Sequence, residues 1–123
     1  MISKILVIDD NPVIVRLDKS LLGSKHYEVL TALDGEEGLK MARERSPDII
    51  FLDIILPGMH GFEVCKRLKE DPGTRHIPVI IVTGSGLEDI ARNEPTLKAD
   101  GYIKKPYGLD ELMKAIEEVE KRS

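Results

Sequence analysis

Cysteine is nearly missing from this sequence. The 123-residue chain holds one, Cys65, so it cannot form a disulfide within itself, and we expect a reducing compartment. Because Cys65 lies beside Val64 in an apolar helical pattern, we expect a small buried hydrophobe and not a reactive thiol.

Runs of basic residues are lacking as well. No stretch of adjacent Lys or Arg is longer than two residues, and 18 Lys and Arg against 22 Asp and Glu give a net charge of −4. Proteins that bind DNA or RNA usually present a basic patch or stripe. We therefore predict no nucleic-acid binding.

Long apolar stretches do not occur either. None approaches the roughly 20 residues that cross a bilayer, and the chain does not open with a charged region followed by an apolar one. We expect a cytoplasmic protein without a membrane segment. The sequence shows no internal repeat or low-complexity stretch, and its length fits one domain, residues 1–123.

Five short apolar runs are present, and each is typical of a buried β-strand. We predict strands at residues 5–8, 28–32, 48–52, 78–82 and 101–104. Helical patterns lie between them. This alternation predicts an α/β fold, with an open, doubly wound parallel sheet and helices on both of its faces.

The first helix is predicted to begin at Asn11 and Pro12, a typical N-cap and first helical residue, and to end near Gly23. The apolar residues that recur near helical spacing along one side of this helix are Val13, Ile14, Leu17 and Leu21. We interpret this side as its apolar face.

Three further helices are predicted from caps and apolar spacing. Asp34 followed by Glu37 resembles a capping box. The residues expected to face inward are Leu39 and Ala42, then Phe62, Val64, Cys65 and Leu68, then Leu109, Leu112, Met113, Ile116 and Val119. Over residues 85–99 the pattern is poor, because Asn93 and Pro95 interrupt it, so we expect one or two short turns.

Polar residues follow four of the strands, where each strand ends. They are Asp9 and Asp10, Asp53, Thr83, and Lys105. Singly, each has an ordinary explanation, as a helix cap, a strand-end ion pair, a turn residue or a solvated charge. In an open parallel sheet, however, the carboxyl ends of the strands are where ligands bind. Together, these residues predict a functional site.

Three clustered carboxylates raise one another's pKa unless a cation lies between them. A Mg²⁺ site typically has few protein oxygen ligands and leaves room for water and a phosphoryl oxygen. A carboxylate such as Asp53 can then act as a nucleophile toward phosphorus and form an acyl phosphate. Lys105 and the Thr83 hydroxyl would hold other phosphoryl oxygens, and the small Gly84 would leave access for a donor or for water.

With these residues in this order, the chain resembles the receiver domain of two-component response regulators, in particular a stand-alone, single-domain one. The resemblance runs from Ile5 through the last helix. The matching motifs are Asp9-Asp10, Asp53 with Pro57-Gly58 and Gly61, Thr83, Gly101-Tyr102 and Lys105-Pro106. It implies a flavodoxin-like sheet of five strands in the order 2-1-3-4-5.

The resemblance also implies a role for each site residue. Asp53 would be the phosphoacceptor and Lys105 the phosphate-binding lysine, with Thr83 and Tyr102 as a switch pair. The Mg²⁺ ligands would be Asp10 directly, Asp9 through water, Asp53 itself and the backbone carbonyl of Ile55.

The implied function is that of a signalling switch and not of an enzyme, since it would promote only its own phosphorylation and dephosphorylation. Its partners would be a sensor histidine kinase or histidine phosphotransfer protein, and a downstream protein bound by the face of helix 4, strand 5 and helix 5. A place as an intermediate in a phosphorelay is the alternative role.

Two residues depart from the family pattern. His60 stands where many relatives have an acidic residue, and we expect it to face solvent beside the site; Pro95 interrupts what is usually a complete fourth helix. We also expect the Lys105–Pro106 peptide to be cis, because the lysine must turn back toward Asp53.

Three other functions are open to the same pattern. A flavin-binding domain is disfavoured because Asp9 and Asp10 would repel a phosphate after the first strand. A Mg²⁺-dependent phosphohydrolase would need a cap or substrate pocket, for which 123 residues leave no chain. An interaction module that has lost the chemistry is disfavoured because every core residue type is present.

Overall fold

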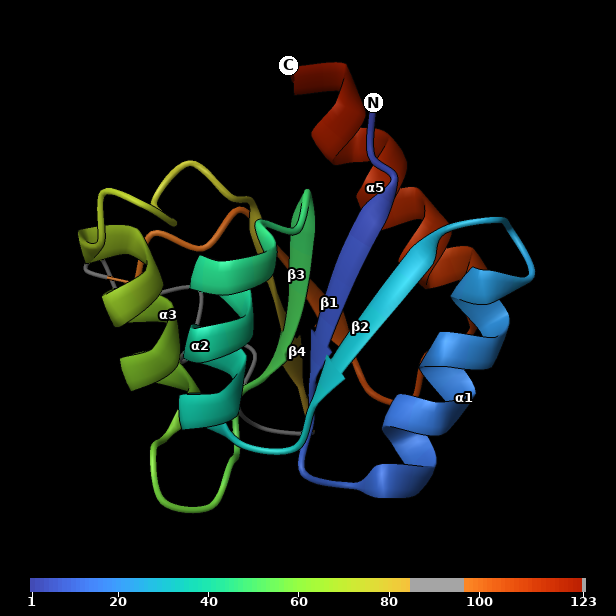
Figure 1. Ribbon diagram of the computed structural model, residues 1–123. Coiled ribbons are helices and arrows are strands. Elements are labelled where there is room, and N and C mark those ends of the chain that lie inside the picture. The colour runs from blue at the N-terminus through green and yellow to red at the C-terminus, as the bar shows by residue number, and fades with distance from the viewer. Residues whose placement is uncertain (85–96, 123) are drawn as a thin grey trace.

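A five-stranded parallel sheet runs through the centre of the protein (Figure 1). The structure is a computed structural model and describes residues 1–84 and 97–122. The strands are β1 (Lys4–Ile8), β2 (Glu28–Ala32), β3 (Ile49–Asp53), β4 (Val79–Thr83) and β5 (Gly101–Lys104). Their order, β2-β1-β3-β4-β5, confirms the prediction from the family resemblance, and each predicted strand lies within one residue of its observed bounds.

Two layers of helices cover the sheet. Helices α1 (Pro12–Gly23) and α5 (Leu109–Arg122) lie on one face, and α2 (Gly35–Arg45) and α3 (Gly61–Glu70) lie on the other (Figure 1). Because successive strand residues point to opposite faces, β3 sends Ile49 and Phe51 into the core under α1 and α5, and Ile50 and Leu52 into the core under α2 and α3. The central strands β3 and β4 are therefore apolar up to their last residues, Asp53 and Thr83.

The helix ends follow local sequence signals. The Asn11 side chain accepts a hydrogen bond from the Val13 N–H at 2.9 Å, with Pro12 as the first helical residue. At the start of α2, Asp34 accepts from the Glu37 N–H at 2.8 Å. These two caps confirm the predicted starts of α1 and α2.

The apolar face predicted for α1 is wrong. Val13 and Leu17 are 65% and 50% exposed, and the buried residues of α1 are instead Val15, Asp18 and Leu22. Both sets recur at helical spacing, so the pattern alone cannot choose between them. The buried side includes a carboxylate because Asp18 has a hydrogen-bond partner inside the protein, the Tyr107 hydroxyl.

Other predictions of local structure can be compared with the described residues. Cys65 is fully buried, as predicted, and burial raises the pKa of its thiol to about 12. The Lys105–Pro106 peptide is cis, as predicted. The short turns expected over residues 85–99 fall mostly outside the described residues. Within the described part, no helix combines the length and apolar character that crossing a membrane requires.

Candidate functional site

The pairing of the strands brings the predicted site residues to one edge of the sheet. Asp53 and Thr83 are the last residues of β3 and β4, while Asp9 and Lys105 directly follow β1 and β5. In the parallel register, Ile8 pairs with Leu52, Asp53 with Val82, and Thr83 with Lys104. The ends of four strands therefore carry these groups side by side, with Asp53 on the central strand.

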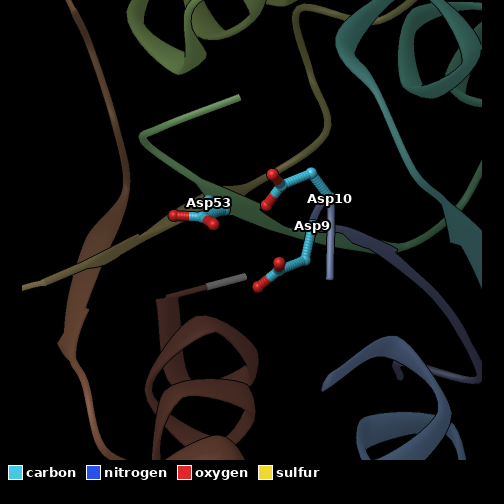
Figure 2. A group of neighbouring side chains, drawn as sticks. All are labelled: Asp9, Asp10 and Asp53. Atoms are coloured by element: carbon cyan, nitrogen blue, oxygen red, sulfur yellow. The ribbon is translucent and has the colours of Figure 1, made fainter. Parts of the chain in front are cut away.

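Three carboxyl groups meet at this edge. One oxygen from each of Asp9, Asp10 and Asp53 lies within 4.8 Å of the others, and Figure 2 shows the three groups around a common space. Asp9 and Asp53 are buried, at 3% and 6% exposure, whereas Asp10 is exposed. The sequence had placed all three here on the strand-end argument alone.

Lys105 supplies the positive charge of the cluster. Its Nζ lies 3.1 Å from an Asp53 oxygen and 3.3 Å from an Asp9 oxygen. Burial alone would lower the pKa of the ammonium, but the charges and hydrogen bonds of Asp53 and then Asp9 outweigh burial and raise this pKa. Lys105 is therefore held in its charged form beside Asp53.

The surroundings of Asp53 destabilise its ionised form. Burial raises the pKa of its carboxyl, the negative charge of Asp9 raises it further, and Lys105 only partly offsets these effects. Among the described residues, one ammonium, that of Lys105, lies in a cluster of three carboxylates, so the cluster carries excess negative charge. A further cation would relieve this repulsion.

The donor atoms fit Mg²⁺. Carboxylate oxygens are the hard ligands that this ion takes in small number, with water and phosphoryl oxygens at the other positions. One Asp9 oxygen is engaged by the Asn11 N–H at 3.0 Å. The fourth predicted ligand residue, Ile55, lies at the rim, 57% exposed, and its N–H donates to Asp53 at 3.3 Å.

Thr83 has a buried hydroxyl that lacks a partner within the described part of the chain. The residue is fully buried, and its Oγ1 has no hydrogen-bond partner among the described residues. Buried polar atoms in proteins are nearly always hydrogen-bonded, so an exception calls for an explanation. Beside it, a Cβ added to Gly84 would meet no atom of the described residues within 4 Å.

Gly61 allows the connection after Asp53 to fold close against the strand. A Cβ at this position would lie 2.5 Å from the Asp53 carbonyl oxygen and 2.6 Å from the Ile54 Cα. The Gly61 N–H donates to the Ile54 carbonyl at 2.9 Å. A glycine here therefore lets the start of α3 pack directly against the end of β3.

The two remaining predicted residues lie at the periphery. Tyr102 of β5 is half-buried and packs against the core under α2 and α3. His60 is exposed, as predicted, and its Nδ1 caps α3 by accepting from the Phe62 N–H at 3.2 Å. The capping role was not predicted.

Sequence reasoning missed one contact near the site. The Tyr107 hydroxyl donates to an Asp18 oxygen at 2.6 Å, although 89 residues separate them in the chain. Tyr107 follows Lys105-Pro106, which could have drawn notice, but an Asp within a helix usually indicates a solvated surface.

Comparisons with known proteins agree with this geometry. The model of the response regulator receiver domain family matches residues 5–117. Response regulator PleD of Caulobacter vibrioides is 53% identical over 83 residues, which are 68% of this chain and 18% of PleD. The matched part thus spans less than a fifth of the length of that relative. The polar-differentiation response regulator DivK of Brucella ovis is 34% identical over 116 residues, covering 94% of each chain.

A solved structure extends the comparison to the site. The receiver domain of sensor histidine kinase PA1611 from Pseudomonas aeruginosa, with a magnesium ion coordinated in its active site cleft, has a TM-score of 0.85 and 25% identity to this chain. The likeness covers 96% of this chain and 97% of that domain. With the family match, the shared strand order and the acidic cluster, it follows that the chain belongs to the response regulator receiver domain family, whose members are phosphorylation-dependent signalling switches and not classical enzymes.

Proposed function

We propose that this protein is a single receiver domain whose Asp53 accepts a phosphoryl group in a Mg²⁺-dependent reaction. The observation that carries the proposal is the place of Asp53 at the end of the central strand. On one side, β1 brings Asp9 and Asp10; on the other, β4 and β5 bring Thr83 and Lys105. Asp53 thus has the acidic residues on one side and a hydroxyl and an ammonium on the other.

Asp53, Lys105 and Thr83 each take a separate part in the phosphoryl transfer. An Asp53 carboxylate oxygen attacks phosphorus, the bond from phosphorus to the donor atom breaks, and its electron pair leaves with the donor. Lys105, already at 3.1 Å from Asp53, balances charge on one phosphoryl oxygen, and the Thr83 hydroxyl donates to another. The buried surroundings of Asp53 strengthen these interactions.

The metal would be held by Asp10 directly, Asp9 through water, Asp53 and the Ile55 carbonyl. A Mg²⁺ ion bound there would neutralise charge on the carboxylates and on the transferring phosphoryl group. The magnesium ion in the cleft of the PA1611 receiver domain supports this assignment.

The physiological donor is a phosphohistidine of a sensor histidine kinase or of a histidine phosphotransfer protein. In that reaction the P–N bond breaks and the imidazole nitrogen takes its electron pair. Since receiver domains interact with such proteins, family membership supports this step. The same chemistry run in reverse would make the protein an intermediate in a phosphorelay.

Phosphorylation by a small donor tests the central step. Incubation with phosphoramidate and Mg²⁺ should add one phosphoryl group, seen by intact-mass spectrometry, and EDTA should prevent the addition. Asp53→Asn should abolish labelling, while Asp110→Asn, which alters an exposed carboxylate on α5, should leave it unchanged. Equal labelling of Asp53→Asn and the unaltered protein would refute the assignment.

The output surface that we propose is the face of helix 4, β5 and α5; the helix 4 part of this prediction falls outside the residues that the structure describes. Tyr102 pairs with Ile81, two residues before Thr83 on β4, so the side chains of Tyr102 and Thr83 lie on the same face of the sheet. Drawn toward a phosphoryl oxygen, Thr83 would leave space that the Tyr102 ring enters. The unmodified protein should already sample this inward ring, because a ligand shifts only existing equilibria.

Fluorine-labelled tyrosine tests this output step. On phosphorylation the Tyr102 signal should move, whereas the Tyr27 signal, at the start of β2 and away from the site, should not. A Tyr102 signal that stays in place while Asp53 is fully phosphorylated would exclude the ring movement.

A further inference from the structure

Two segments of the chain build one side of the site and meet again beside it. The first runs from Asp9 at the end of β1 into α1, and the second runs from Lys105 at the end of β5 toward α5. They are joined at the site by the Lys105–Asp9 ion pair at 3.3 Å. They are joined a second time by the 2.6 Å hydrogen bond from Tyr107 to Asp18.

The second junction is partly buried. Asp18 is 1% exposed, on the side of α1 that also buries Val15 and Leu22, and Tyr107 packs against the core under α1 and α5. Burying a carboxylate costs free energy even when the group is paired, and well-packed apolar residues of similar volume are often as stable or more stable. The contact therefore invites a role other than filling space.

The pair is also within electrostatic reach of the site. Burial raises the pKa of Asp18, and the hydrogen bond from Tyr107 opposes this effect. The charge of Asp9 then raises the pKa of Asp18, and that of Lys105 lowers it. Asp9 and Asp53 both contribute to raising the pKa of Tyr107, after burial and Asp18.

We propose that Tyr107 is a positioning residue for Lys105, held by Asp18, and that their hydrogen bond keeps the Lys105 ammonium against Asp53 during phosphoryl transfer. Only Pro106 lies between Lys105 and Tyr107 in the chain. An anchor at Tyr107 therefore sets where the lysine leaves the strand. This inference rests on the proposed function, since it assigns a role within the same site.

The Tyr107–Asp18 hydrogen bond matters because binding of the proposed metal ion would weaken the Lys105–Asp9 ion pair. The Lys105–Asp9 ion pair depends on a carboxylate that the proposed metal ion would share, and a shared charge attracts the ammonium less. The Tyr107–Asp18 bond uses neither a residue of the acidic cluster nor Lys105 itself. It can hold the two segments together whether or not the cluster is neutralised.

Four variants separate positioning from stability. Tyr107→Phe removes the bond but leaves Asp18 buried without it. Asp18→Asn keeps an acceptor for the Tyr107 hydroxyl. The double variant Asp18→Leu/Tyr107→Phe removes both polar groups, which can be nearly neutral for folding. Tyr27→Phe, which removes a partly buried hydroxyl at the opposite end of the strands, is the matched control.

The rate of labelling by phosphoramidate in saturating Mg²⁺ is the first readout. Tyr107→Phe and the double variant should be slower by about five- to tenfold, the loss expected for one hydrogen bond. Asp18→Asn and Tyr27→Phe should stay within about twofold of the unaltered protein. Mg²⁺ affinity should be unchanged in all four, because no proposed ligand is altered.

The second readout needs neither metal nor phosphodonor. The NMR signal of the Lys105 ε-methylene group in EDTA should shift in Tyr107→Phe and in the double variant, but not in Tyr27→Phe. Rapid labelling and an unshifted Lys105 signal in the folded double variant would overturn the inference. So would labelling of Asp18→Asn as slow as that of Tyr107→Phe, because charge and not the bond would then be responsible. Absence of labelling in the unaltered protein would overturn the proposed function itself, and the inference with it.

Discussion

Replacing Asp10 with asparagine should stabilise the metal-free protein. Within the described residues, Lys105 forms ion pairs with Asp9 and Asp53 and none with Asp10, so Asp10→Asn removes a charge without breaking an ion pair. Asp9 is next to Asp10 in the unfolded chain as well. Folding therefore adds mainly the repulsion between Asp10 and Asp53, whose oxygens lie within 4.8 Å.

The size of this repulsion follows from Coulomb's law. At 4.8 Å, two unit charges repel by about 0.9 kcal/mol with the screening of bulk water, and by about 3.5 kcal/mol at an effective dielectric constant of about 20. Asp10 is exposed, so the lower limit applies, and we expect the free energy of unfolding to rise by about 1 kcal/mol. For a chain of this length the melting temperature should rise by about 4 °C.

Mg²⁺ should reverse the order of stability, so that the unaltered protein becomes more stable than Asp10→Asn. An ion that binds only the folded state adds about 2.7 kcal/mol when its free concentration is 100 times Kd. The unaltered protein should gain this stability, whereas Asp10→Asn, which lacks the proposed direct ligand, should gain little. Melting curves by circular dichroism, first in EDTA and then over a Mg²⁺ titration, would show the crossing.

Glu117→Gln provides the control, because it removes an exposed charge from α5 and should change stability by less than about 0.5 kcal/mol in either condition. High NaCl should shrink the advantage of Asp10→Asn in EDTA, since exposed charges are screened by salt. The reasoning would be refuted if the variant were less stable than the unaltered protein in EDTA, or if Mg²⁺ raised both melting temperatures equally.

Three further predictions concern the surroundings of the site and the far end of the sheet. Gly61→Ala places a Cβ 2.5 Å from the Asp53 carbonyl oxygen, so urea unfolding should show a loss of about 1–3 kcal/mol, and labelling of Asp53 should slow; normal values for both would contradict the close packing. Burial opposes ionisation of Asp48, but hydrogen bonds from residues 3 and 4 outweigh burial and lower its pKa, so Asp48→Ala should cost about 1–2 kcal/mol at neutral pH. That contribution is present above the unfolded pKa near 4 and is lost as pH falls through the lowered folded pKa, so a stability gap that persisted in strong acid would argue against it. His60→Asp should stabilise α3 by about 0.5–1 kcal/mol, because aspartate is a better N-cap and suits the helix dipole; melting against His60→Ala checks this, and a gain no larger than that of alanine would contradict it.

The strands were predictable because their signal is local. An apolar run such as residues 49–52 can be buried only as an interior strand or a buried helix, and the turn residues that follow it favour the strand. The order of the strands is not local, since β1 pairs with β3 and β2, which lie on either side of it. That order came from the family resemblance.

That these residues meet at one edge of the sheet was predictable for the same reason, because Asp53, Thr83 and Lys105 each follow or end a strand and parallel strands end at one edge. The burial of α1 was not. Val13 and Leu17 form as good a helical stripe as Val15 and Leu22, and the choice depends on Asp18. Its partner lies 89 residues further on, beyond the reach of any local pattern.

The Thr83 hydroxyl, which has no partner among the residues that the structure describes, has a consequence for the balance between the two signalling states. A buried polar group without a hydrogen bond costs about 1–3 kcal/mol. A phosphoryl oxygen on Asp53 that accepts this hydrogen bond would remove that cost from one conformation and not from the other. Such a difference corresponds to a change of about 5- to 150-fold in the ratio of the two populations. The buried Thr83 hydroxyl could therefore supply much of the free energy by which phosphorylation shifts the protein from one state to the other.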